Sequence, residues 1–198
     1  MAEQPISARD QLLHAAIEYV AEHGVGDLSL RRLAAAIGTS HRMLIYHFGS
    51  KEGVFIAVIR AVEEQQRRTL AAFELDPALS PAEVMRRMWK HLADPALWPN
   101  ERLFFELYGQ ALQGRPYSED LLEGIVERWV EPAAELSIAR GVPAELARAH
   151  ARLGVAIVRG LLLDLLATGD VAGVDAAMDA FIELYERWLD AAGRARPA

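Results

Sequence analysis

The 198-residue sequence contains no cysteine. Without this residue a chain cannot form disulfides, thiolate zinc sites, iron–sulfur clusters or a cysteine nucleophile, and its absence favours a reducing compartment. There is also no run of about 18 uncharged apolar residues, and no basic segment followed by an apolar one after Met1. We therefore expect a soluble protein of the cytoplasm with no membrane partner.

Motifs for catalysis are missing as well. The sequence has no nucleophile elbow and no metal-ligand spacing, and Gly24-Val-Gly26 lacks the preceding strand and the third glycine of a nucleotide-binding loop. His91 and His150 stand alone, without a ligand-spaced partner. We therefore expect no enzyme activity, no cofactor and no metal.

Positive charge is scarce overall but concentrated in one window. Residues 28–51 hold Arg31, Arg32, Arg42 and Lys51 and no acidic residue, so the window carries +4, while a total of −7 leaves −11 for the rest of the chain. Screening limits the reach of distant charge to about 8–10 Å, so a basic island in an acidic chain can still bind phosphate. This window is the first candidate for a nucleic-acid contact.

Apolar residues recur at spacings of three and four and seldom at two, which predicts an all-α chain. Serines that can cap helices and glycines that can end them predict short helices over residues 7–24, 29–38 and 40–48, and a long helix over 50–73. Five or so further helices follow residue 81, the last two at about 144–168 and 174–192. Prolines mark breaks after Asp94, Trp98, Arg115, Glu131 and Val142.

Residues 29–48 have the spacing of a helix-turn-helix, with Ala34 facing the second helix and Gly38 in the tight turn. A step of about 100° per residue places Leu44 on the core side of the second helix and Arg42, Met43 and Tyr46 on the opposite side. The second helix therefore presents a free polar face.

The residue types on this face suit DNA. Arg42 can bind guanine or phosphate through two donors, Met43 suits a thymine methyl group, and Tyr46 suits a phosphate. Lys51, at the start of the next helix after Ser50, suits a second phosphate. The predicted DNA contacts are Ser29, Arg31, Arg32, Thr39, Ser40, His41, Arg42, Met43, Tyr46, His47 and Lys51.

The chain also resembles the TetR-type bacterial one-component repressors from about Arg9 to Ala57. The resemblance lies in Ala15-Ala16, Gly24, Leu28–Ala34, Ile37–Ser40 and His47–Glu52. In the family a tyrosine directly follows the leucine of the recognition helix, whereas here Ile45 follows Leu44 and the tyrosine is Tyr46. Arg42 also stands where the family often has glycine.

This resemblance implies a DNA-binding domain at residues 1–50 and a ligand-binding and dimerisation domain at 51–198, joined through a linker helix at 51–73. It favours a ligand-responsive repressor that binds a palindromic operator as a homodimer. The alternative is an all-helical carrier of an apolar small molecule that does not bind DNA. Loss of affinity with rising salt would identify the DNA-binding protein.

Aromatic residues in the second domain suggest where an apolar or aromatic effector binds, although such rings serve equally well as core. For the dimer, the apolar spacing of the last helix predicts contacts through the last two helices. The predicted effector residues are Trp89, Phe104, Phe105, Tyr108 and Trp129, and the predicted dimer stripe is Val174, Met178, Phe181, Tyr185 and Trp188.

Charged residues in the second domain have several interpretations. Glu101, Arg102 and Glu106 are expected to face solvent along a helix. Arg159 and Asp164 lie in a helix that is apolar nearly all round, so each needs a partner or a route to solvent. Pairing across a subunit interface and extension to the surface both remain open for these two.

Overall fold

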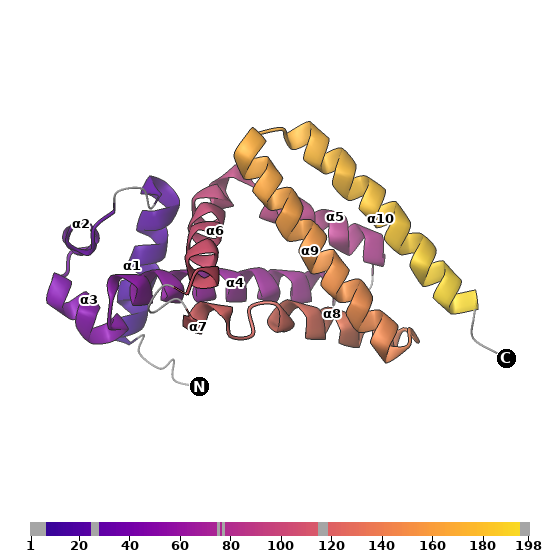
Figure 1. Cartoon of the computed structure of the whole chain (residues 1–198), viewed down its shortest axis with the longest axis horizontal. Helices are drawn as coiled ribbons and strands as arrows, with labels where there is room; N and C mark the ends of the chain where they lie inside the picture. Colours follow the sequence, from indigo (N-terminus) through magenta and orange to yellow (C-terminus); the bar gives the residue numbers. More distant parts are fainter. Residues whose placement is uncertain (1–6, 25–27, 75, 77, 115–118, 195–198) are drawn as a thin grey trace. The chain divides into compact units, whose positions relative to one another are not determined.

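The computed structural model describes residues 7–24, 28–74, 76, 78–114 and 119–194. Within these ranges the chain forms helices joined by turns, and no strand occurs (Figure 1). The predicted all-α fold is confirmed. The helices are α1 (Ala8–His23), α2 (Leu30–Ala36), α3 (His41–Phe48), α4 (Lys51–Glu74), α5 (Pro81–Leu92), the 3-10 turn η1 (Pro95–Leu97), α6 (Trp98–Leu112), α7 (Glu119–Leu122), α8 (Glu127–Ala139), α9 (Ala144–Thr168) and α10 (Val171–Arg194).

These helices fall into two compact units. The first comprises residues 1–65 and 95–122, and the second comprises 66–94 and 123–198. Helix α4 begins in the first unit and ends in the second. This division differs from the functional boundary predicted at residue 50, which stays a prediction.

Each of the first four helices begins after a serine. The hydroxyl oxygens of Ser7, Ser29, Ser40 and Ser50 each accept a hydrogen bond from the backbone N–H three residues later, at 3.1, 3.2, 3.1 and 2.8 Å. Such caps satisfy donors that have no partner inside the helix. The helix starts predicted from these serines are confirmed.

The core of the first unit is built from residues on several of its helices. Val20 of α1, Leu33 of α2, Leu44 of α3 and Val54 of α4 are each fully buried. Leu28 is buried just before the Ser29 cap, where a hydrophobic staple onto Leu33 is expected. Apolar burial of this kind sets the positions of the three short helices.

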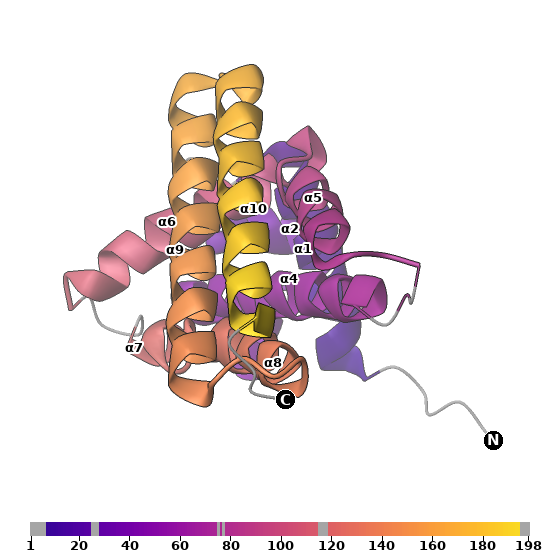
Figure 2. The ribbon, with the colours of Figure 1, turned by 90° about the vertical axis from the view of Figure 1, so that its right-hand side faces the viewer.

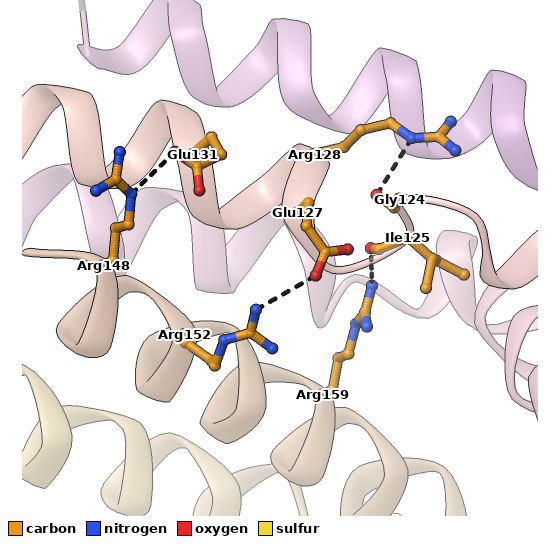
Figure 3. A network of polar contacts seen from close by, with 8 residues as sticks. All are labelled: Gly124, Ile125, Glu127, Arg128, Glu131, Arg148, Arg152 and Arg159. Atoms are coloured by element: carbon orange, nitrogen blue, oxygen red, sulfur yellow. Dashed lines mark hydrogen bonds and ion pairs between the residues drawn. The ribbon is translucent and has the colours of Figure 1, made fainter. Parts of the chain in front are cut away.

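In the second unit, α9 packs along α8 through pairs of charged side chains (Figure 3). Arg148 of α9 meets Glu131 of α8 at 3.3 Å, and one turn later Arg152 meets Glu127 at 3.3 Å. These pairs are about half exposed, so each adds at most about 1 kcal/mol. Between the two helices, Ala134 of α8 and Ala147 of α9 are fully buried in one apolar cluster, which the charged pairs flank.

Helices α9 and α10 form a hairpin (Figure 2), and α10 also packs on α5. The buried indole of Trp89 on α5 donates from Nε1 to Oδ1 of Asp175 on α10 at 2.7 Å. One turn away on both helices, Arg86 meets Asp179 at 3.3 Å. Two polar links thus hold α5 and α10 in one register.

Two expectations for individual residues are wrong. Helix α8 continues through Pro132, although a break was predicted there, so packing along α9 outweighs the local cost of proline. Glu101 is only 7% exposed rather than facing solvent, whereas Arg102 and Glu106 on the same helix are exposed as predicted. The predicted break at Arg115-Pro116 lies outside the described residues.

Apolar helices in the described part of the chain are too short or too charged to cross a membrane.

Candidate nucleic-acid interface

The turn between α2 and α3 is held by hydrogen bonds from two backbone amides. Thr39 N–H donates to the carbonyl of Ala34 at 2.9 Å, and Gly38 N–H donates to that of Ala35 at 3.4 Å. This pairing is a Schellman motif, and it places Gly38 at a φ of +71°, where glycine carries no side-chain penalty. The glycine predicted to make the tight turn of the helix-turn-helix therefore does so.

Helix α3 has one buried side and one exposed side. Leu44 is fully buried, while Tyr46 is 79% exposed and Met43 is 40% exposed. Arg42 and His41 are exposed on the same helix. The face predicted to read DNA is therefore open to a partner, with a guanidinium, a thioether and a phenol along eight residues.

Ser29 and Ser40 have a structural role in addition to the predicted one. Both hydroxyl oxygens accept from backbone amides as helix caps, and both residues are exposed. A hydroxyl that accepts in this way still has its hydrogen to donate to a phosphate oxygen. Of the remaining predicted contacts in this region, Arg31 and Arg32 are exposed on α2, and Thr39 is half-buried in the turn.

The joint between α3 and α4 is unusually close. A Cβ atom on Gly53 would overlap the carbonyl oxygen of Phe48, so only glycine fits without a shift of the backbone. Gly53 N–H also donates to the Ser50 hydroxyl. Beside this joint, the exposed Lys51 holds its Nζ 5.5 Å from the centre of the Phe55 ring.

His47 lies less accessibly than its neighbours on α3. Its ring contacts those of Tyr46 and Phe48 edge-on, at centroid distances of 5.0 and 6.4 Å. Its Nε2 atom is buried and has no hydrogen-bond partner among the described residues. This atom is not presented to solvent, which favours a structural role for the ring over base reading.

The predicted effector residues are divided between the two units. Phe104, Phe105 and Tyr108 lie together on α6: Phe104 stacks on Tyr108 at 5.4 Å and meets Phe105 edge-on at 5.2 Å. In the second unit, the guanidinium carbon of Arg67 lies 5.6 Å from the centre of the Trp129 ring. Trp89 is buried with its N–H bonded to Asp175. The effector site stays a prediction.

Asn100 was missed by the sequence reasoning. It lies on the first turn of α6 and is 6% exposed, and its Oδ1 atom is buried with no hydrogen-bond partner among the described residues. A polar residue at the start of a helix usually faces solvent, so only the packing of α6 reveals its burial.

Two predictions for the last helices are revised. Val174, Met178 and Phe181 are buried within the single chain, so the prediction that they form the dimer contact is wrong. Arg159 finds a partner inside the chain, because its Nη2 donates to the Ile125 carbonyl at 2.7 Å (Figure 3). Asp164 is exposed.

Comparison with known proteins finds similarity to bacterial regulators, strongest at the N-terminal end of the chain. Residues 12–58 match the family model described as bacterial regulatory proteins, tetR family. The chain is 34% identical over 93 residues to the HTH-type transcriptional repressor AcnR of Corynebacterium efficiens, covering 47% of this chain and 45% of AcnR. The chain thus spans about half the length of such relatives.

Relatives that match over most of the chain share a lower sequence identity with it. The chain is 27% identical over 190 residues to the HTH-type transcriptional regulator BetI of Pseudomonas paraeruginosa, covering 94% of both chains. Among solved structures, the fold matches the multidrug binding protein EbrR complexed with imidazole at a TM-score of 0.62 and 27% identity, over 89% of this chain and 88% of that one. A transcriptional regulator from Rhodococcus sp. Rha1 matches at a TM-score of 0.71 and 21% identity, over 90% and 95%.

The match over α1 to α4, the capped helix-turn-helix and the all-α fold agree with one another. Over residues 12–58 the chain is similar to the tetR family of bacterial regulatory proteins.

Proposed function

We propose that this chain is a transcriptional repressor, not an enzyme, which binds a palindromic operator as a homodimer and whose affinity for DNA changes when a small molecule binds. The observation that supports this most is the exposed face of α3, with Arg42, Met43 and Tyr46, on a helix-turn-helix that matches the family model. The names of relatives such as AcnR, a transcriptional repressor, agree with it.

In this proposal α3 enters the major groove. Arg42, in the first turn of α3, would bind the O6 and N7 atoms of guanine, or a phosphate, through two parallel N–H donors. Met43 would contact a thymine methyl group, and the Tyr46 hydroxyl would donate to a phosphate oxygen. Lys51, at the start of α4, would neutralise a further phosphate.

The homodimer is supported by exposed apolar stripes on the last two helices. On α9, Leu153, Gly160 and Leu163 are exposed at spacings of seven and three residues, so they lie on one side of the helix. On α10, Ala177, Ala180 and Leu184 are exposed at spacings of three and four residues, so they too lie on one side of the helix. Small and leucine side chains in such stripes let helices from two copies pack closely, as in a four-helix bundle.

The effector proposal rests on α6. The rings of Phe104, Phe105 and Tyr108 offer apolar area, and the buried Oδ1 of Asn100 offers a hydrogen-bond acceptor on the same helix, four residues before Phe104. Trp129 and Trp89 of the second unit remain predicted effector residues. An aromatic molecule with an N–H donor suits the groups on α6. The structural relative EbrR is named a multidrug binding protein and was solved with proflavin.

Selection of bound fragments from random duplex DNA tests the function. We expect an enriched palindromic motif. With the motif in hand, Arg42→Ala should lose about 1–3 kcal/mol of binding free energy and relax preference at one base position, whereas Tyr46→Phe should weaken all sequences alike. Binding of apolar dyes without enrichment of any DNA would instead support the carrier.

A further inference from the structure

Arg9 lies outside the basic window of the sequence but beside the DNA-facing helix in the structure. It is the second residue of α1, and its guanidinium carbon lies 5.1 Å from the centre of the Phe48 ring, at the last residue of α3. About half of the Arg9 side chain is exposed. The guanidinium therefore sits on the end of α3 that is opposite to Arg42.

We propose that Arg9 is a further DNA-contact residue, which binds a backbone phosphate at the edge of the major groove that α3 enters. This inference rests on the proposed function, because it needs α3 to lie in that groove.

The cation–ring contact of Arg9 with Phe48 leaves N–H donors available for a phosphate. A guanidinium that lies over an aromatic ring uses its face for the ring, while its N–H groups point outward in its own plane. Those N–H groups can grip two oxygens of a phosphate side by side. Phe48 thus acts as a platform that holds the donors of Arg9 in place before DNA arrives.

The position along α3 also fits a phosphate rather than a base. From Arg42 to Phe48 the helix rises about 9 Å, at about 1.5 Å per residue. The major groove is about 12 Å wide, so when Arg42 reaches a base edge, a group at the other end of α3 approaches the groove wall, where the phosphates lie. A contact there would add affinity and fix orientation without reading sequence.

Neighbouring groups at this end of α3 are compatible with an approaching backbone. Arg9, Phe48, Gly49 and Ser50 line one open groove of about 540 Å³ between α1 and the start of α4. The two glycines there, Gly49 and Gly53, add no side chain that could block access. Arg60 and Glu64 line the same groove with opposite charges. Asp10 Oδ1 lies 4.0 Å from Arg9 Nη1, and its Oδ2 accepts from the Ser7 hydroxyl at 2.7 Å.

The test uses the full chain with Arg9→Met, which keeps an apolar stem on Phe48 but removes the charge. The chain offers a matched control in Arg102 of α6, another exposed arginine, whose guanidinium carbon lies 5.7 Å from the centre of the Trp98 ring. Arg102→Met removes the same kind of cation–ring contact away from the helix-turn-helix. Binding is measured over a salt series on the selected operator and on a duplex of random sequence.

We expect Arg9→Met to weaken binding roughly three- to tenfold on both duplexes and to reduce the slope of log affinity against log salt by about one unit. Arg9→Lys should recover the slope but only part of the affinity, because an ammonium binds phosphate through a single point. Arg102→Met should change neither. An unchanged slope in Arg9→Met, with wild-type protein still binding the operator, would overturn the inference while leaving the proposed function intact. If wild-type protein binds neither duplex, the proposed function itself fails.

Discussion

The helix-turn-helix and the α8–α10 region are specified in different ways. Around α3, order comes from residues close in sequence: serine caps at the starts of α2 and α3, and a glycine turn at Gly38. In the α8–α10 region, neither α8 nor α9 has a side-chain cap, and the contacts join residues far apart, such as Trp89 with Asp175 and Arg152 with Glu127. Individual caps and turns of the first region can therefore be predicted from the sequence. For the second region the sequence predicts helices but not which residues contact one another.

This difference explains why the buried and exposed sides of α3 could be predicted from the sequence. The burial of Leu44 and the exposure of Met43 and Tyr46 follow from position on a short capped helix alone. A helix that spans only eight residues leaves little freedom in which side faces the core.

The largest expected effect concerns the joint between α3 and α4, where Gly53 lies against the backbone of Phe48. Gly53→Ala would place Cβ against the Phe48 carbonyl oxygen, which belongs to the backbone and cannot turn aside. We expect a loss of about 3 kcal/mol in the free energy of unfolding, at the upper end for overpacking, together with weaker operator binding. Urea denaturation and DNA titration measure the two effects.

Gly109→Ala is the matched control. Gly109 also lies inside a helix, α6, but an added Cβ there meets nothing within 4 Å. Alanine should therefore stabilise the chain by up to about 1 kcal/mol, through its better helix propensity. Equal effects of the two substitutions would mean that the α3–α4 joint is looser than the structure describes.

A second prediction tests the long-range contacts of the other region. Trp89→Phe keeps a buried ring on α5 but removes the N–H that Asp175 accepts. We expect a coupling free energy of about 1 kcal/mol between Trp89→Phe and Asp175→Ala in a double-mutant cycle, measured by urea denaturation. The exposed pair Arg86 and Asp179, one turn away, should couple by only a few tenths of a kcal/mol. A coupling free energy between Trp89 and Asp175 no larger than that between Arg86 and Asp179 would contradict a stabilising role for the indole hydrogen bond.

The contrast between local and long-range contacts also separates what could be predicted from the sequence from what could not. The all-α fold, the helix starts and the exposed side of α3 were predictable, because caps, turns and periodicity are local. The continuity of α8 through Pro132 was not, because the local cost of proline is outweighed by packing on α9. Nor was the place of Arg9 on Phe48, or the burial of Glu101, because each depends on helices distant in sequence.

The choice of dimer stripe failed for a related reason. Val174, Met178 and Phe181 have the spacing of an apolar helix face, but spacing alone does not say whether the chain itself or a second copy covers that face. In the structure they are buried within the chain, and two of the three residues in the exposed stripe of α10 are alanines, which a hydrophobicity pattern emphasises less.

The smallest expected effect concerns pH in the α8–α10 region. His150 of α9 stacks on Trp188 of α10, with ring centroids 4.5 Å apart and planes 18° from parallel. Burial lowers the pKa of His150 below its usual value, because a charged imidazolium loses hydration there. The unfolded chain therefore takes up the proton at a higher pH than the folded chain does.

It follows that His150 lowers the free energy of unfolding only at pH values below its pKa in the unfolded chain. Above the unfolded pKa of about 6.5 both states are neutral at this residue and it contributes no pH dependence. As pH falls below that value, the unfolded state binds more protons and the free energy of unfolding decreases. His150→Phe keeps a ring on Trp188 but cannot titrate, so its stability should fall less steeply than that of the wild type between neutral pH and about pH 5. Urea denaturation at a series of pH values measures both slopes, and parallel slopes would show that His150 stays equally hydrated in the folded chain.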